Sequence, residues 1–318
     1  MGSNYVLTTD HLAWRHSHPS TADAFEAASN AVDRLMASLA VEEAFAVLIA
    51  NYIAFEKAVA SVNVENMVRS GASMAELLDR RREVDRHLVN LLAAGEMASE
   101  HALRRTKKEF GRKSNEVARL DGAFREQRES LVGFWATECL RNAVLHNALP
   151  ITSWTTGGKW VGLETADGNL SKRSPTARLE HSVTFAFATD LLMLDSKLDR
   201  ALIDRLKAER ADEKGNVSWV LTIREYVEGL SLIIGEVRKI WAEVESAASA
   251  LLLDMVHMYR ASLPEDEEQP LYLFVAETSD DGRWQRDVLV SAGLEAQLAE
   301  LRGKNKPMVN LHRRLLIG

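Results

Sequence analysis

The sequence predicts a mainly α-helical protein: an up-and-down helical bundle with a small β insertion and a short C-terminal α/β appendix. Apolar residues recur at helical spacing over most of the 318-residue chain. Strand-like alternation replaces that period only around 151–190 and again after 263. Helices that are joined by short loops pack antiparallel. We therefore expect a helical domain over 20–262, interrupted by the β insertion, and an extension over 263–318.

Two helices, at 21–40 and 41–61, are predicted near the N-terminus, the first capped by Ser20 or Thr21. A break at 71–73 with Ser73 as the cap precedes a long helix that reaches about residue 110. Gly111 is suited to end that helix, because glycine tolerates the left-handed conformation of a helix C-terminus.

The predicted β insertion starts directly after Pro150. Segments 151–155 and 159–163 flank a glycine turn and are expected to form a hairpin, with 182–188 as a third strand beside it. The polar stretch 167–176 reads as a loop.

Helices resume at 191–210. The following helix, 218–262, carries apolar residues alternately three and four positions apart, as in a coiled coil. The appendix is predicted to hold a strand at 271–277 and a short helix at 284–301.

Composition restricts the function classes. Hydrophobic residues make up 46% of the chain and charged residues 27%, which is typical of a soluble globular protein. No apolar run approaches the ~18 residues that span a bilayer, so we expect no membrane association. Cys139 is the one cysteine, and no internal disulfide can form, which fits a reducing cytoplasm.

The net charge of −7 argues against nonspecific nucleic-acid binding by the whole surface, but it leaves room for a local basic site. Basic residues cluster at 80–82 and at 104–108, a pattern that usually marks a solvated helix face. Residues 1–20 have no clear period and are expected to form a loop or a poorly ordered terminus. They include His16 and His18, but nothing nearby completes a metal site, and we predict no metal and no other cofactor.

The most informative stretch is the C-terminal end of a helix predicted from about 114 to 147. Its inner face becomes polar in the last turns, and Pro150 disfavours helical geometry at the residue before it. The stripe on this face consists of Trp135, Cys139, Asn142 and His146. A histidine in the last turn is favoured in its protonated form by the helix dipole.

Arg141 precedes His146 by five residues, about 140° around the helix. The two side chains can reach one ligand only if it lies across the helix end, or if a second copy of the helix faces it. Glu138 is within reach of either Arg141 or Asn142.

This arginine–histidine spacing, followed by Leu149-Pro150, resembles the Arg–four-to-six–His motif of HEPN domains. Residues 123–151 (AFREQRESLVGFWATECLRNAVLHNALPI) also resemble the helix that carries the motif in that superfamily. HEPN proteins are all-helical, and many are metal-independent RNA nucleases of toxin and antiviral systems.

The resemblance implies an endoribonuclease that acts as a homodimer in the cytoplasm, with RNA as substrate, an antitoxin or regulatory protein as a further partner, and no DNA. Arg141 would bind the phosphate, His146 would act as base or acid, and Asn142 would orient the substrate or His146. Glu138 and Asn147 are predicted to contact the substrate.

Two alternatives stay open. Asn142 and His146 could be satisfied in a buried helix seam, with Arg141 paired to Glu138. The whole protein could then be a noncatalytic helical dimerisation or interaction module, for which the helix at 218–262 is the best indication.

Overall fold

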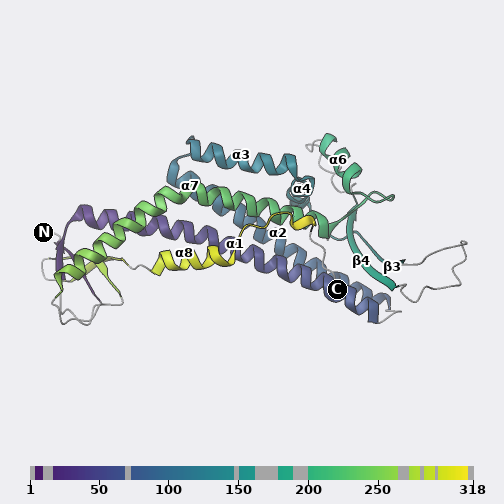
Figure 1. The fold of residues 1–318 in the computed structure, drawn as a ribbon, viewed down its shortest axis with the longest axis horizontal. Helices are drawn as coiled ribbons and strands as arrows, with labels where there is room; N and C mark the ends of the chain where they lie inside the picture. Colours follow the sequence, from purple (N-terminus) through teal and green to yellow (C-terminus); the bar gives the residue numbers. More distant parts are fainter. Residues whose placement is uncertain are drawn as a thin grey trace, which may run out of the picture. The chain divides into compact units, whose positions relative to one another are not determined.

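The prediction of a mainly helical protein with small antiparallel sheets is confirmed. The structure is a computed structural model that describes residues 4–9, 17–68, 73–146, 150–161, 178–188, 200–263, 272–279, 283–290 and 293–313 (Figure 1). The helices are α1 (Ala22–Val68), α2 (Met74–Phe110), α3 (Asn115–Ser130), α4 (Val132–His146), α6 (Arg200–Arg210), α7 (Trp219–Ser262) and α8 (Gly293–Lys304). The strands are β1 (Asn4–Thr8), β2 (Ser17–Ser20), β3 (Ser153–Val161), β4 (Arg178–Ala188), β5 (Asn216–Ser218), β6 (Phe274–Thr278) and β7 (Trp284–Leu289), and a 3₁₀ turn spans Leu311–Arg313.

The chain forms two compact units. The first unit comprises Met1–Ala46, Glu100–Leu120 and Ile234–Lys306, and the second comprises Val47–Ser99, Asp121–Ile233 and Pro307–Gly318. The long helices α1, α2 and α7 each contribute to both units. The predicted boundary at 262/263 stays a prediction.

The first unit contains an antiparallel sheet of order β2-β1-β6-β7. Pairing of Val6 with Ala276 brings the N-terminal strand beside the C-terminal part of the chain. The expectation of a loop at 1–20 is therefore wrong for β1 and β2. Local periodicity could not indicate these strands, since the partner that stabilises β1 lies about 270 residues away and the edge strand β2 contains Pro19.

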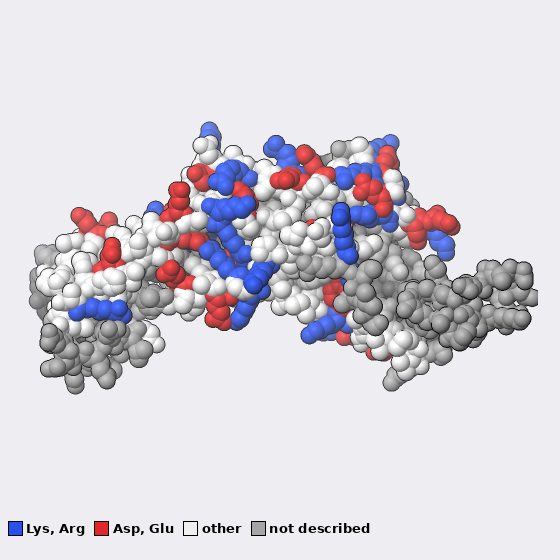
Figure 2. All heavy atoms as spheres, viewed as in Figure 1, with Lys and Arg blue, Asp and Glu red and all other residues white. Residues whose placement is uncertain are grey.

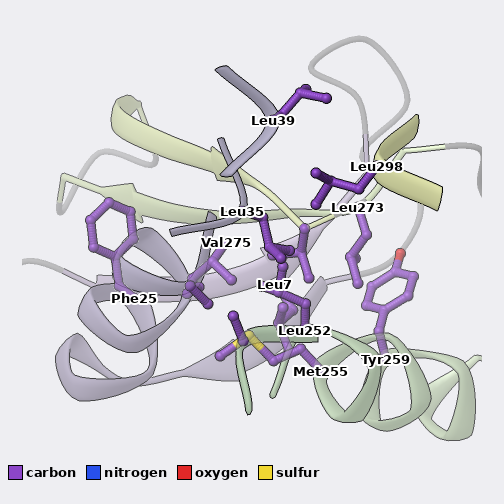
Figure 3. Packing of buried hydrophobic residues seen from close by; sticks show 14 residues of the cluster. Leu7, Phe25, Leu35, Leu39, Leu252, Met255, Tyr259, Leu273, Val275 and Leu298 are labelled. Atoms are coloured by element: carbon purple, nitrogen blue, oxygen red, sulfur yellow. The ribbon is translucent and has the colours of Figure 1, made fainter. Parts of the chain in front are cut away.

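Apolar side chains from this sheet and from α1, α7 and α8 point toward one another and form the core of the first unit (Figure 3). Its larger buried members include Leu7, Phe25, Leu35, Leu252, Met255, Tyr259, Leu273, Val275 and Leu298. The prediction of one helix over 284–301 is wrong. Its first part forms strand β7, because pairing with β6 overrides the local helical period, and only Gly293–Lys304 is helical.

A buried group of charged side chains joins three helices in the first unit. Glu42 of α1, only 1% exposed, accepts hydrogen bonds from Arg238 of α7 at 2.8 and 2.7 Å and from Arg302 of α8 at 2.9 Å. Arg302 also donates to Glu245 of α7 at 2.8 and 2.6 Å. The hydroxyl of Ser38 donates a hydrogen bond to Glu245 and accepts one from Arg302, so it caps no helix end.

The two helices predicted at 21–40 and 41–61 are in fact one helix, α1, because no Gly, Pro or cap interrupts the chain between them.

The second unit contains a three-stranded antiparallel sheet of order β3-β4-β5. The predicted hairpin with a turn at 156–158 is wrong, because β3 continues through both glycines, Gly157 and Gly158, and pairs along its whole length with β4. The predicted strand at 182–188 and its pairing are confirmed. The predicted loop at 167–176 and the start of the helix predicted at 191 lie outside the described residues.

Helix ends at α2 follow the sequence closely. Ser73 and Glu76 form a reciprocal capping box, with Ser73 N donating to Glu76 Oε2 at 2.7 Å and Glu76 N to Ser73 Oγ at 3.3 Å. Gly111 has φ +86° and ends α2, as predicted.

The charged group around Glu42 yields a stability prediction. Glu42→Ala should lower the free energy of unfolding by about 3–5 kcal/mol, because it leaves Arg238 without its carboxylate in a largely buried position. Urea denaturation would measure the change. The matched control is Glu43→Ala at the neighbouring exposed position, which should stay within about 0.5 kcal/mol of wild type. Equal losses in the two variants would contradict the assignment.

Candidate functional site

The helix that carries the arginine–histidine motif is α4, and it begins later than the sequence predicts. The single helix expected over 114–147 is interrupted at Leu131, between α3 and α4. Gly133 at the start of α4 donates its N–H to Glu225 Oε2 of α7 at 2.6 Å, and a Cβ on Gly133 would lie 2.6 Å from the same oxygen. The break thus lets the start of α4 approach a buried carboxylate. At the other end the described part of α4 reaches His146, and the stop predicted near Asn147 lies outside the described residues.

Arg141 is held by α2. Its Nη1 forms an ion pair with Oε2 of Glu96, and the arginine side chain is 17% exposed. The alternative pairing with Glu138 is not what the structure contains, because Glu138 accepts two hydrogen bonds from Arg128 of α3, at 2.6 and 3.1 Å. The substrate contact suggested for Glu138 stays a prediction.

Tyr226 of α7 completes the surroundings of Arg141. The tyrosine is 1% exposed, and its ring packs on Phe134 of α4 with centroids 5.4 Å apart. Burial raises the pKa of the Tyr226 hydroxyl, and the neighbouring Arg141 guanidinium opposes that rise. A Cβ at Gly95 of α2 would collide with the Tyr226 hydroxyl, so this glycine makes room for a close contact between helices. Three helices therefore place Glu96, Arg141 and Tyr226 together.

The chain that leaves α4 is fixed on two sides immediately after the motif. The buried carboxylate of Asp85 in α2, 2% exposed, accepts the N–H of Ile151 at 3.0 Å. Trp219 at the start of α7 donates its indole N–H to the carbonyl of Pro150 at 2.8 Å. Because Pro150 follows His146 by only four residues, these two bonds limit where the end of α4 can lie.

The structure describes the side chains of only some of the predicted site residues. Arg141 and Glu138 are described with their contacts. Asn142 and His146 belong to α4, but their side chains lie outside the described part of the chain, as does all of Asn147. The roles predicted for these three residues stay predictions.

The sequence reading missed Glu96, Tyr226, Asp85 and Trp219. Each lies on α2 or α7, far from the motif along the chain, and no local pattern around it differs from that of an ordinary amphipathic helix. The one available signal was Gly95, a glycine inside a strong helix, which commonly marks a close approach.

No group of three metal-ligating side chains occurs among the residues that the structure describes. By length and composition one helix, α1, could cross a membrane, although half of its most apolar window is buried inside the protein. A core helix of a folded bundle passes the same test, so the predicted cytoplasmic location stays a prediction.

Comparison with known proteins adds no relative. No protein-family model matches the chain, and no curated protein or solved structure matches it either.

Asp85 allows a test of the contact that holds Ile151. Asp85→Ala should cost about 1–3 kcal/mol, because it leaves a fully buried N–H without an acceptor, whereas Asp85→Asn keeps a carbonyl oxygen of the same shape. Urea unfolding of both variants would measure this, with Asp79→Ala, an exposed carboxylate on the same helix, as the control.

The same variants have a defined pH dependence. Burial is the main cause that raises the pKa of Asp85 above its ordinary value. The folded state then binds more protons than the unfolded state between about pH 4 and the raised pKa, so wild type should lose stability relative to Asp85→Asn as the pH rises through that window. A wild type that gains stability relative to Asp85→Asn over that window would contradict the environment described for Asp85.

Proposed function

We propose that the protein is a metal-independent endoribonuclease of HEPN type, and that the C-terminal end of α4 carries its active site. The observation that supports the proposal is the setting of Arg141: a cation built into the last turns of α4, oriented by Glu96 and close to the end of the helix at His146. The bacterial defence setting and the antitoxin or other regulatory partner come from the HEPN resemblance alone.

In the proposed reaction the 2′-hydroxyl of RNA attacks the adjacent phosphorus and forms a 2′,3′-cyclic phosphate. The bond from phosphorus to the 5′-oxygen breaks, and this oxygen leaves as a hydroxyl. A base must take the 2′-hydroxyl proton and an acid must protonate the leaving oxygen, and histidine has a pKa suited to either step near neutrality. Arginine offers a planar cation for the charge that develops on phosphate.

The ion pair with Glu96 is compatible with phosphate binding. A guanidinium has five N–H donors in a fixed plane, more than one carboxylate can accept. Glu96 is itself one-third exposed, so the pair lies at the edge of the helical interior. Glu96 would orient Arg141 for a phosphate that approaches from solvent.

A second candidate is a noncatalytic helical interaction protein. The ion pair of Arg141 favours it, because an arginine held between helices by a carboxylate needs no ligand. The behaviour of a His146 variant distinguishes the two functions.

His146→Ala should reduce RNA cleavage by at least ~100-fold, as expected for a lost general acid or base. Its melting temperature should change little, because the dipole contribution of a histidine at a helix end is only about 0.3–1 kcal/mol. Cleavage by wild type should persist in EDTA and leave cyclic phosphate. His257→Ala, at an exposed position of α7, is the control and should cleave normally. Wild type that leaves RNA intact, together with an early-melting His146→Ala, would favour the interaction protein.

One chain supplies one motif arginine and one motif histidine, which are too few for acid, base and charge stabilisation. We therefore expect a homodimer whose two α4 helices approach each other. Sedimentation at micromolar concentration should give twice the 35.5 kDa mass of one chain. A monomeric mass under these conditions would contradict this arrangement.

A further inference from the structure

The two basic clusters of the sequence differ in the structure. In the cluster at 80–82, each arginine has an acidic partner: Arg80 pairs with Glu65, Arg81 with Asp85 and Arg82 with Asp79, at 3.0, 3.4 and 2.9 Å. The charges of this cluster are therefore neutralised by neighbouring carboxylates, so ion pairs within the protein account for the cluster without a ligand.

The second cluster, at 104–108, is not neutralised, and Arg112 and Lys113 directly after α2 extend it to residue 113. Segment 104–113 contains six basic residues and one acidic residue, Glu109. Glu109 forms an ion pair with Arg34 of α1 at 2.8 Å, so it does not neutralise the segment. Within the described residues, no ion pair joins any of the six to a carboxylate, while most other arginines of the described surface have one. The exposed members are Arg104, Lys108, Arg112 and Lys113. Figure 2 shows Lys and Arg side chains over the region where α3 begins, with acidic side chains beside them.

Helix stabilisation explains only part of this cluster. Lys107 and Lys108 lie in the last turn of α2, where the dipole favours cations by about 0.3–1 kcal/mol each. Arg112 and Lys113 lie between the C-terminus of α2, whose dipole favours cations, and the N-terminus of α3, which Ser114 caps and whose dipole disfavours them. The two dipoles oppose each other at these positions, so helix stabilisation gives no net reason for the two exposed cations.

We propose that Arg104, Lys108, Arg112 and Lys113 form a surface that binds the phosphate backbone of single-stranded RNA without reading its sequence. The choice of RNA rests on the proposed function, whereas the polyanion chemistry rests on the uncompensated charge. The one aromatic residue of the segment, Phe110, is only partly exposed and is engaged in a T-shaped contact with the buried Trp241, with centroids 5.8 Å apart. Charge without stacking favours contact with phosphates over contact with bases.

The test compares two quadruple variants with the same loss of charge. The first replaces Arg104, Lys108, Arg112 and Lys113 by Gln. The control replaces four ion-paired cations whose side chains are 65–72% exposed: Arg82, Arg86, Lys239 and Lys304. Binding to labelled 2′-O-methyl RNA, which lacks the attacking hydroxyl, is measured by fluorescence anisotropy between about 50 and 200 mM salt.

Four phosphate contacts predict that the logarithm of the association constant falls with the logarithm of salt at a slope of about −3, which is roughly fifty-fold over that range. The first variant should lose most of this slope, and the control should keep it. Equal slopes in wild type and the first variant, equal losses in both variants, or binding to anionic vesicles and not to RNA would overturn the inference. Salt-dependent RNA binding without RNA cleavage would support this binding surface and contradict the proposed nuclease activity. RNA cleavage together with an unchanged salt slope in the first variant would support the nuclease activity and contradict the binding surface.

Discussion

Charged side chains that α7 carries into the interior are the constraint on which the fold depends. In each unit they meet partners from other elements, and an unpaired charge at any of these positions would cost several kcal/mol. The pairs are Arg224 with Glu56, Glu225 with Arg210 and the N–H of Gly133, Arg238 with Glu42, and Glu245 with Arg302. Glu228 adds a further anchor, because it accepts the N–H groups of Asn310 and Leu311 at 2.8 and 2.9 Å and contacts His312. An apolar helix face alone tolerates a shift of one turn, whereas these pairs do not. We infer that they set the register of the bundle.

The difference between local signals and contacts with distant parts of the chain explains how much of the fold the sequence could predict. The bounds of α2 follow from apolar periodicity together with Ser73 and Gly111, both of which act within a few residues of the helix end that they determine. The range of α7 follows from apolar periodicity. Strands β1, β2 and β7 depend on partners far along the chain, and no local pattern contains that information. The break at Leu131 belongs to the same class, because it depends on Glu225 of α7.

The candidate site divides in the same way. The place of Arg141 on a helix that continues to His146 was predictable, because helical spacing is a local signal. Glu96 and Asp85 were not, since they come from α2, and Ile151 lies 66 residues from the carboxylate that holds it. Sequence reasoning found the residues that a helix end presents, but it could not find those that fix the helix end in place.

The position of the Arg141 pair distinguishes it from the pairs that organise the bundle. The side chains of Glu42 and Glu225, the carboxylates at the centre of those pairs, are 2% exposed, and the side chains of Glu56 and Glu245 are only slightly more exposed. Glu96, in contrast, is 33% exposed. The Glu96 oxygen that faces Arg141 is nevertheless buried, so solvent reaches this pair only through the remaining parts of the two side chains. An apolar contact between α2 and α4 would hold the helices as well. Stability therefore gives little reason to place an arginine, a carboxylate and a buried tyrosine hydroxyl together beside the end of α4. Under the proposed function, a phosphate that arrives from solvent would give each of them a role: Glu96 would orient the guanidinium of Arg141, and Tyr226 would support it from the interior.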